Sequence, residues 1–309
     1  MSLDPITACK QAGFSEAFLL PNTAYEDWTR HRTDGAFHSN AAYLAADPVR
    51  SYPWANACLI AVWPYKPFDD DTVVCAYYLA SNRAYHAINE LLQLFRREGI
   101  RAERAETPYR TQLLSAGIGT RMDNQLWYYP PYGTYVHLQG VMLNLPEPIA
   151  YTAPHANAPV CDHCGRCGAA CFGALCNGAF DWKNCIRSFL ENDPLPERFL
   201  PELRCFSGCE RCQNACPKNP ADRVSVPSEV RAALDPVEIV KGNDRAALQL
   251  LGTNRKKQLL RQAIVLCANR NRTEALPYLW ALFERTDKKY QPELAYAISL
   301  LQNGRNVIE

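Results

Sequence analysis

Two short runs of cysteines have the spacing of iron–sulfur ligands. The first run follows the pattern C-x2-C-x2-C-x3-C and consists of Cys161, Cys164, Cys167 and Cys171. The second follows C-x2-C-x3-C, precedes a proline and consists of Cys209, Cys212 and Cys216. In two-cluster iron–sulfur proteins, three cysteines at this spacing bind one [4Fe–4S] cluster, and the last cysteine of the run binds the other. The sequence therefore predicts two [4Fe–4S] clusters and a role in electron transfer.

The exchange of last cysteines between the runs predicts two sets of ligands. The first set comprises Cys161, Cys164, Cys167 and Cys216. The second set comprises Cys171, Cys209, Cys212 and one further thiolate. By spacing alone, Cys185 and Cys205 are both candidates for this eighth position.

Zinc is the main alternative metal, and buried thiols are the alternative to any metal. Structural zinc usually binds two separated cysteine pairs, whereas the first run supplies a triplet. His163, inside that run, is an alternative ligand, but we expect it to be a surface loop residue. The cysteines without ligand spacing are expected to be small buried hydrophobic residues, namely Cys9, Cys58, Cys75, Cys176 and Cys267.

The bulk composition is that of an ordinary globular protein. Of the 309 residues, 48% are hydrophobic and 21% are charged, and the formal net charge is +1. No apolar run approaches the ~20 residues that cross a bilayer. The first residues show no basic patch followed by an apolar stretch, so we expect no secretion signal and a cytoplasmic protein. Fourteen cysteines in such a protein favour metal or thiol chemistry over a disulfide framework.

Composition divides the chain into three expected domains, at residues 1–150, 151–222 and 223–309. The first alternates strands with helices, which predicts an α/β (α+β) sandwich. Its expected strands are Ala57–Trp63, Val73–Leu79, Leu126–Tyr129 and Thr134–Leu143, and its expected helices are 82–98 and 109–116. The second domain holds the cysteine runs and little core of its own, so the clusters would replace a hydrophobic interior.

The third domain is expected to be a short α-helical repeat of HEAT-like type. Its predicted amphipathic helices are Arg255–Cys267, Glu274–Phe283 and Glu293–Leu301. Residues 227–309 carry 13 Lys and Arg against 9 Asp and Glu. This mild excess is compatible with nucleic-acid binding, and equally with solvated helix faces.

Three stretches resemble the epoxyqueuosine reductase family, in order and approximate spacing. They are CDHCGRCGAAC at 161–171, KNCIRSFLE at 183–191 and SGCERCQNACPKN at 207–219. In that family the cysteine of the second stretch is a ligand, so the resemblance implies Cys185 as the eighth. It further implies a cobalamin-dependent oxidoreductase of queuosine biosynthesis, which takes electrons from a low-potential donor and reduces epoxyqueuosine in tRNA.

The amino-terminal half is similar to the same family more loosely, in three further segments. They are NAAYLAADPVRSYPWANACLIAVWPY at 40–65, TPYRTQLLSAGIG at 107–119 and PPYGTYVHLQGVMLNLPEP at 130–148. The similarity implies that cobalamin lies between the α/β domain and the clusters. The residues that would then face it are Gly117, Gly119, Tyr132, Gly133, Tyr135 and Val136. The helical tail would contact tRNA phosphates through Arg255, Lys256, Lys257, Arg261, Arg270 and Arg272.

The chain also departs from the family pattern. The family has a proton-donor aspartate before a Tyr-His pair, and Ala84 takes that place here. The segment Thr120–Asn124 lacks the usual tryptophan and lysine, and Phe172 replaces a proline. Two hypotheses follow: an enzyme in which Asp123, His86 or Tyr85 supplies the proton, or a non-catalytic iron–sulfur electron-transfer protein.

Overall fold

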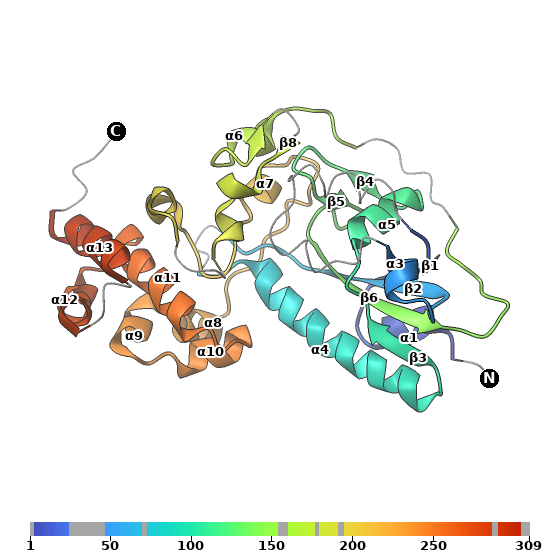
Figure 1. The fold of residues 1–309 in the computed structure, drawn as a ribbon. Helices are drawn as coiled ribbons and strands as arrows, with labels where there is room; N and C mark the ends of the chain where they lie inside the picture. Colours follow the sequence, from blue (N-terminus) through green and yellow to red (C-terminus); the bar gives the residue numbers. More distant parts are fainter. Residues whose placement is uncertain are drawn as a thin grey trace. The chain divides into compact units, whose positions relative to one another are not determined.

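The computed structural model describes residues 3–24, 47–69, 73–153, 160–176, 179–190, 195–285 and 290–303 (Figure 1). Two compact units are interleaved along the chain. Unit 1 comprises Met1–Lys66, Ala80–Asn184 and Arg211–Asp222. Unit 2 comprises Pro67–Leu79, Cys185–Glu210 and Arg223–Glu309. The cysteine-rich stretch 151–222 is thus shared between the units, and its standing as a separate domain stays a prediction.

A four-stranded antiparallel sheet forms the centre of unit 1. Its spatial order is β1-β2-β6-β3, with bounds Glu16–Pro21, Ala57–Pro64, Val136–Asn144 and Arg101–Arg104. Leu59 of β2 pairs with Leu19 on one side and with Val141 on the other. The first six residues of β2 are buried, as expected for a continuous apolar run in the middle of a sheet.

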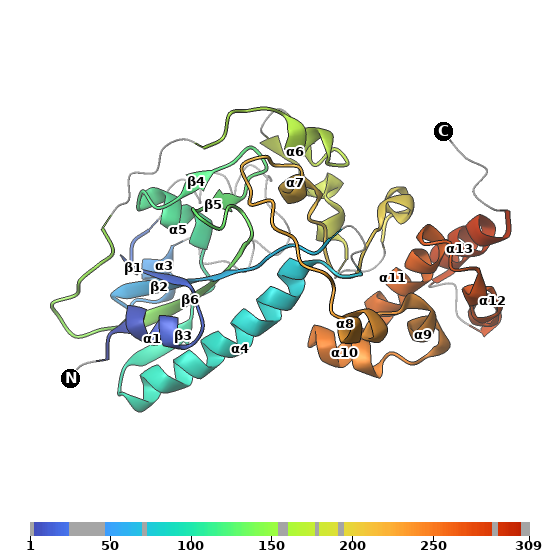
Figure 2. The same ribbon diagram turned by 180° about the vertical axis from the view of Figure 1, so that it is seen from behind.

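Helices cover both faces of this sheet, so unit 1 has three layers (Figures 1 and 2). On one face, α1 (Pro5–Gln11) and α4 (Ala76–Arg97) contribute to a core with the odd-numbered residues of β2. On the other face, α5 (Tyr109–Ser115) and Trp127 pack on its even-numbered residues. Trp127 belongs to a hairpin of β4 (Thr120–Arg121) and β5 (Trp127–Tyr128). A further short helix, α3 (Pro48–Ser51), is capped by Asp47.

The cysteine-rich stretch contains only short elements. In unit 1 these are α6 (Arg166–Ala169), β7 (Leu175–Cys176), β8 (Ala179–Phe180), η2 (Trp182–Asn184) and α7 (Arg211–Asn214). In unit 2 they are η3 (Ile186–Ser188) and η4 (Glu197–Glu202). Among the described residues from 160 to 184, only Ala174 and Leu175 are buried hydrophobic residues. Residues 160–184 therefore have almost no core of their own, as expected for 151–222. The expectation is wrong for 185–210, where Phe199, Leu200 and Phe206 are buried.

The rest of unit 2 is helical. Its elements are α8 (Ser228–Ala233), α9 (Pro236–Lys241), α10 (Arg245–Leu251), α11 (Lys256–Asn269), η5 (Thr273–Ala275), α12 (Leu276–Arg285) and α13 (Gln291–Asn303). The central helix α11 is buried along most of its length and packs against α9 and α13. A buried ion pair between Arg261 and Glu293, 3.5 Å apart, joins α11 to α13. Gly242 and Gly252 end α9 and α10 in the left-handed conformation.

Most predicted elements are present, but one predicted strand and the expectations for two residues are wrong. The expected strand Val73–Leu79 is wrong, because only Val74 forms a bridge and α4 begins at Ala76. The apolar residues 76–79 belong to the first turn of α4 and not to a strand. Cys176 is exposed and not buried. Arg261, expected to contact phosphate, is buried against Glu293. In the described part of the chain, no helix is both long and apolar enough to cross a membrane.

Candidate iron–sulfur site

The first cysteine run folds as a tight loop that leads into α6. His163 and Gly165 both adopt left-handed backbone angles, with φ of 54° and 74°. Gly165 is the residue before α6, and its carbonyl accepts a hydrogen bond from the amide of Ala169. These reversals curl the loop, which is the shape that three cysteines need in order to face one point. Cys161 and Cys167 are half-buried and Cys164 is exposed.

The second arm of the site is α7 and the turn that follows it. The amide of Cys216 donates to the carbonyl of Gln213, and the amide of Asn219 donates to the carbonyl of Cys216. Cys216 is thereby fixed just beyond the end of α7. The helices α6 and α7 lie against each other within unit 1, so the two cysteine runs meet although they are about fifty residues apart in sequence.

A buried hydrogen-bond network joins the second arm to the turn before β6. The side-chain oxygen of Asn219 accepts from the amide of Thr134 at 2.8 Å. Its amide nitrogen donates to the Thr134 hydroxyl and to the Gln213 carbonyl, each at 2.8 Å. The Tyr135 hydroxyl donates to Asn214 at 2.9 Å. The α/β core therefore determines where Cys216 lies.

The two arms and the β4–β5 turn enclose a pocket. It is lined by Met122, Asp123, Asn124, Cys161, Asp162, Cys164, Gly165, Cys167, Cys216 and Lys218. All four cysteines of the first predicted ligand set are among these residues, and all are free thiols. Four thiols around one pocket are the donor set of a [4Fe–4S] cluster.

The second predicted set is divided between the units. Cys171 and Cys212 belong to unit 1, and Cys185 and Cys209 belong to unit 2. All four are half-buried. Cys205, the other candidate for the eighth position, is buried.

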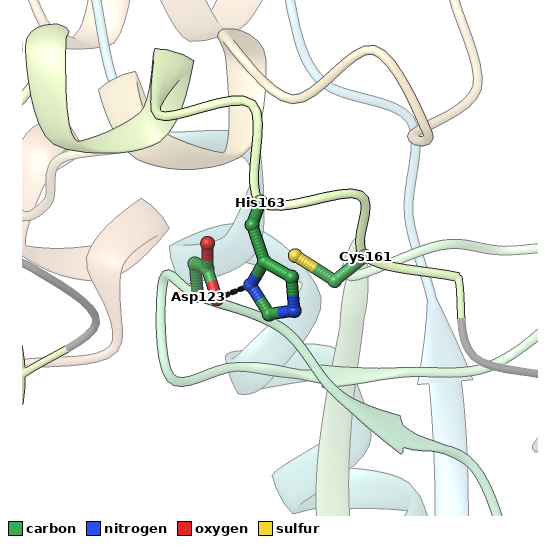
Figure 3. A group of neighbouring side chains, drawn as sticks. All are labelled: Asp123, Cys161 and His163. Carbon is green, nitrogen blue, oxygen red and sulfur yellow. Dashed lines mark hydrogen bonds and ion pairs between the residues drawn. The ribbon is translucent and has the colours of Figure 1, made fainter.

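Charged side chains surround the first set of cysteines. Asp123 accepts from His163 Nδ1 at 2.9 Å. A carboxylate oxygen of Asp123, a ring nitrogen of His163 and Cys161 Sγ all lie within 4.8 Å of one another (Figure 3). Asp162 pairs with Lys218 at 3.2 Å, and the hydrogen bond from Lys218 lowers the pKa of Asp162. Burial raises the pKa of the Cys167 thiol. His163 is an exposed loop residue, as expected, and it also contacts Asp123 at the edge of the site.

The three candidate proton donors lie in different surroundings. Asp123 lines the pocket. Tyr85 and His86 are exposed on α4, and the Arg104 guanidinium lies 4.5 Å from the centre of the Tyr85 ring. Neither of these two lines the pocket. Ala84, which precedes Tyr85 on α4, is fully buried in the hydrophobic core that α4 covers. A carboxylate at that position would lack water.

The residues expected to face cobalamin have contacts within the protein that account for several of them. A Cβ on Gly119 would lie 2.1 Å from Trp127, and one on Gly133 would lie 2.4 Å from Asn219. Tyr135 is buried and hydrogen-bonded to Asn214. Tyr132 and Val136 are half-buried, and Gly117 adopts a positive φ of 70°. Packing within the protein therefore accounts for Gly119, Gly133 and Tyr135 without a corrinoid. Residues 40–46 of the early similar segment lie outside the described residues.

Sequence reasoning missed four of the residues around the pocket, namely Met122, Asn124, Asp162 and Lys218. Asp162 lies inside the first run and Lys218 directly follows Cys216-Pro217. Because Asp162 and Lys218 carry opposite charges and each lies close to a predicted ligand in the sequence, an ion pair beside the first ligand set could have been predicted. Nothing in the spacing indicates that Met122 and Asn124 approach the thiols, since the β4–β5 turn brings them there.

Comparison with known proteins identifies relatives along both sequence and fold. No family model matches the chain. An epoxyqueuosine reductase of Bacillus anthracis is 29% identical over 182 residues, which cover 53% of this chain and 46% of the relative. That of Bacillus subtilis (strain 168) is 30% identical over 189 residues, covering 55% and 47%. The chain therefore spans about half the length of these curated relatives.

Solved structures share the fold over most of the chain. An epoxyqueuosine reductase crystallised with an epoxyqueuosine-modified tRNA-Tyr stem loop has a TM-score of 0.73 at 20% identity, covering 96% of this chain and 98% of that one. The enzyme from Streptococcus thermophilus has a TM-score of 0.74 at 16% identity, covering 98% and 90%. The chain is thus similar to epoxyqueuosine reductases in sequence over about half of its length and in fold over most of it.

Proposed function

We propose that the protein is an iron–sulfur oxidoreductase that passes electrons through two [4Fe–4S] clusters to a corrinoid, which reduces an organic substrate. A low-potential donor would supply the electrons. The leading substrate is epoxyqueuosine in tRNA, because the relatives are named for that reaction.

The observation that carries this proposal is the meeting of Cys161, Cys164, Cys167 and Cys216 around one pocket. The thiolates would hold the iron, Asn219 and Gln213 would keep Cys216 in position, and Asp123 and Lys218 would set the local charge.

Metal analysis tests the clusters. Anaerobic reconstitution should give about eight irons and eight sulfides per chain, with the broad visible absorption of two cubanes. Replacing Cys185 by Ser should remove about four irons, whereas replacing Cys205 should remove none. A colourless protein, or one that contains zinc under oxygen-free conditions, contradicts the proposal.

A corrinoid is the proposed electron acceptor between the clusters and the substrate. When bound, it would supply the strongly reducing cobalt centre that the clusters by themselves lack. Cobalamin titrated into the reconstituted protein should change the visible spectrum of the cobalamin. An unchanged spectrum would remove the corrinoid and leave electron transfer.

The helices α8 to α13, which we propose to be a brief HEAT-like repeat, would contact tRNA. Arg255, Lys256 and Lys257 are exposed at the start of α11. Binding to tRNA should weaken steeply with salt, and Lys257→Ala should lower the salt slope by about one. Lys241→Ala is the control, because Lys241 already pairs with Glu238 at 2.7 Å. Failure to bind at low salt would exclude the nucleic-acid substrate.

The alternative function is electron transfer without substrate chemistry. The buried Ala84, in place of the family's acid, is the observation that favours it. In the enzyme, Asp123 is the remaining candidate acid beside the clusters, and Asp123→Asn should abolish substrate reduction while leaving the iron content unchanged. Full clusters, no cobalamin binding and rapid electron exchange with a redox dye would support the carrier.

A further inference from the structure

A second pair of neighbouring sulfur atoms lies in unit 2. Cys75 and Cys205 are separated by 130 positions, and their sulfur atoms lie 3.2 Å apart. Both residues are buried, with 1% and 7% of their surface exposed. The pair is neither part of the first set nor required by the resemblance, which assigns the eighth ligand to Cys185.

Backbone contacts hold the two sulfur atoms together. The strand segments around Val74 and Phe206 form a parallel bridge, in which the Phe206 amide donates to the Val73 carbonyl at 2.8 Å. The Cys75 amide in turn faces the Phe206 carbonyl at 3.4 Å. Cys75 and Cys205 flank the bridging residues, so both side chains leave the bridge on its other side.

The loop after Cys205 closes over this sulfur pair. A Cβ on Gly208 would lie 2.7 Å from both Cβ and Sγ of Cys75, so only glycine fits there. Glu210 then accepts a hydrogen bond from the Tyr77 amide at 2.9 Å, at the start of α4. The close approach of the two thiols is therefore built into four consecutive contacts between the 73–77 and 205–210 segments.

We propose that Cys75 and Cys205 form a redox-active dithiol that closes to a disulfide when the protein meets a peroxide. One thiol sulfur attacks a peroxide oxygen, which yields a sulfenic acid and one water. The second thiol sulfur displaces the hydroxyl as another water and forms the S–S bond. Two electrons pass from the two sulfurs to the peroxide, and both thiol protons leave in the waters. The sulfurs must approach by only about 1 Å to reach bonding distance.

The pair lies where it would report on the second cluster. Cys205 is four residues before Cys209, a predicted ligand, and shares its loop. A disulfide would tie that loop to the start of α4 without consuming a ligand. The inference also assigns Cys205 to a partner other than iron, which leaves Cys185 as the eighth ligand.

Mass spectrometry of the reconstituted protein tests the proposal. The protein is exposed to one equivalent of hydrogen peroxide, quenched in acid, alkylated without reduction and digested with trypsin. The expected product links the peptide that contains Cys75 to the peptide of residues 205–211, with the loss of two hydrogens. Arg204 and Arg211 place Cys205 and Cys209 on one peptide, and Cys58 shares the peptide of residues 51–83 with Cys75 because trypsin does not cleave between Lys66 and Pro67. Fragmentation within both peptides must therefore assign the link to Cys75 and Cys205.

Two variants provide the controls. Cys267 is a buried thiol of the same unit, so Cys267→Ser should leave the linked peptide unchanged. Cys205→Ser should abolish the link and keep the full iron content. Recovery of Cys75 and Cys205 as separate alkylated thiols after peroxide would overturn the proposal. Loss of half the iron in Cys205→Ser would overturn it too, by making Cys205 a ligand. A linked peptide in a protein that never binds iron would support the dithiol and contradict only the proposed function.

Discussion

At the scale of single residues, Gly133 shows how closely the site is joined to the core. Its φ is 65°, and a Cβ would meet Asn219 at 2.4 Å and Pro220 at 2.8 Å. Gly99 has a similar φ of 75°, with nothing within 4 Å of a Cβ. An alanine at either position would strain the backbone, but only an alanine at position 133 would also collide with a neighbouring residue.

We expect Gly133→Ala to lower the free energy of unfolding by about 3 kcal/mol and Gly99→Ala by about 1 kcal/mol. The backbone cost is common to both, and the displacement of Asn219 adds to the first. Urea denaturation of the two variants measures the difference. Equal losses would show that the turn yields without disturbing Asn219.

The cysteine thiols make a second prediction at this scale. Cys216 lines the pocket, whereas Cys176 is exposed on β7. Cys216→Ser should reduce the iron content from about eight to about four per chain, because one cluster loses a ligand. Cys176→Ser should bind as much iron as the unaltered protein. Iron and sulfide assays after anaerobic reconstitution measure both, and a full complement of iron in Cys216→Ser would contradict the ligand assignment.

His137 on β6 gives a prediction for the effect of pH. Arg104 donates to the Gln139 oxygen at 3.0 Å, so the Gln139 amide nitrogen faces His137 Nε2 at 2.9 Å. Nε2 must then accept, which requires a neutral ring. Burial, with Arg104 nearby, lowers the pKa of His137 from 6.5 to about 4.

Between these two pKa values the unfolded chain binds a proton that the folded chain does not, so stability falls as the pH is lowered from 6.5 to about 4. The loss attributable to His137 is about 3 kcal/mol at most. Urea denaturation across this interval should show a smaller loss for His137→Gln. His86→Gln, at an exposed position on α4, should follow the unaltered protein. Parallel curves for all three proteins would refute the neutral imidazole.

At the scale of elements, the segment 160–184 depends on something other than hydrophobic packing. Only Ala174 and Leu175 are buried hydrophobic residues among its described positions. The bound clusters would supply the missing interior. Removal of iron by a chelator should therefore raise amide hydrogen exchange in 160–176 by at least tenfold, while β2 and β6 keep their protection. Unchanged exchange in 160–176 would mean that the loop holds its shape without metal.

The elements also show what a sequence can predict here. The run Ala57–Trp63 was recognisable as a buried strand because apolar β-branched and aliphatic residues are continuous there. The strands β1 and β3 were not predicted: β3 has the sequence Arg-Ala-Glu-Arg, and only Ala102 in it is buried. The start of α4 was misjudged as a strand, since Glu210, far along the chain, caps the Tyr77 amide. Spacing predicted the thiols that meet, but not the Asn219 network that positions them.

At the scale of the whole molecule, charge is distributed unevenly along the chain. Residues 227–309 are mildly basic and the remainder is slightly acidic. The chain spans about half the length of its Bacillus relatives but nearly all of the solved structures' fold. The eight cysteines proposed as cluster ligands are present, and Ala84 stands where the resemblance expects an acid. The proposed function therefore depends more on the cysteines than on a retained proton donor.

The interleaving of the two units has a practical consequence for dissecting the protein. The polypeptide passes from one unit to the other at five places, after residues 66, 79, 184, 210 and 222. A fragment of residues 1–222 would contain the segments 67–79 and 185–210 of unit 2 but lack the rest of that unit. The missing part includes α11 and α13, which pack against η4. Such a fragment would expose apolar side chains such as Phe199 and Leu203, which are buried in the full chain, and we expect it to aggregate. Because the two units are interleaved, point substitutions in the full chain are better suited than truncations for testing the role of each unit.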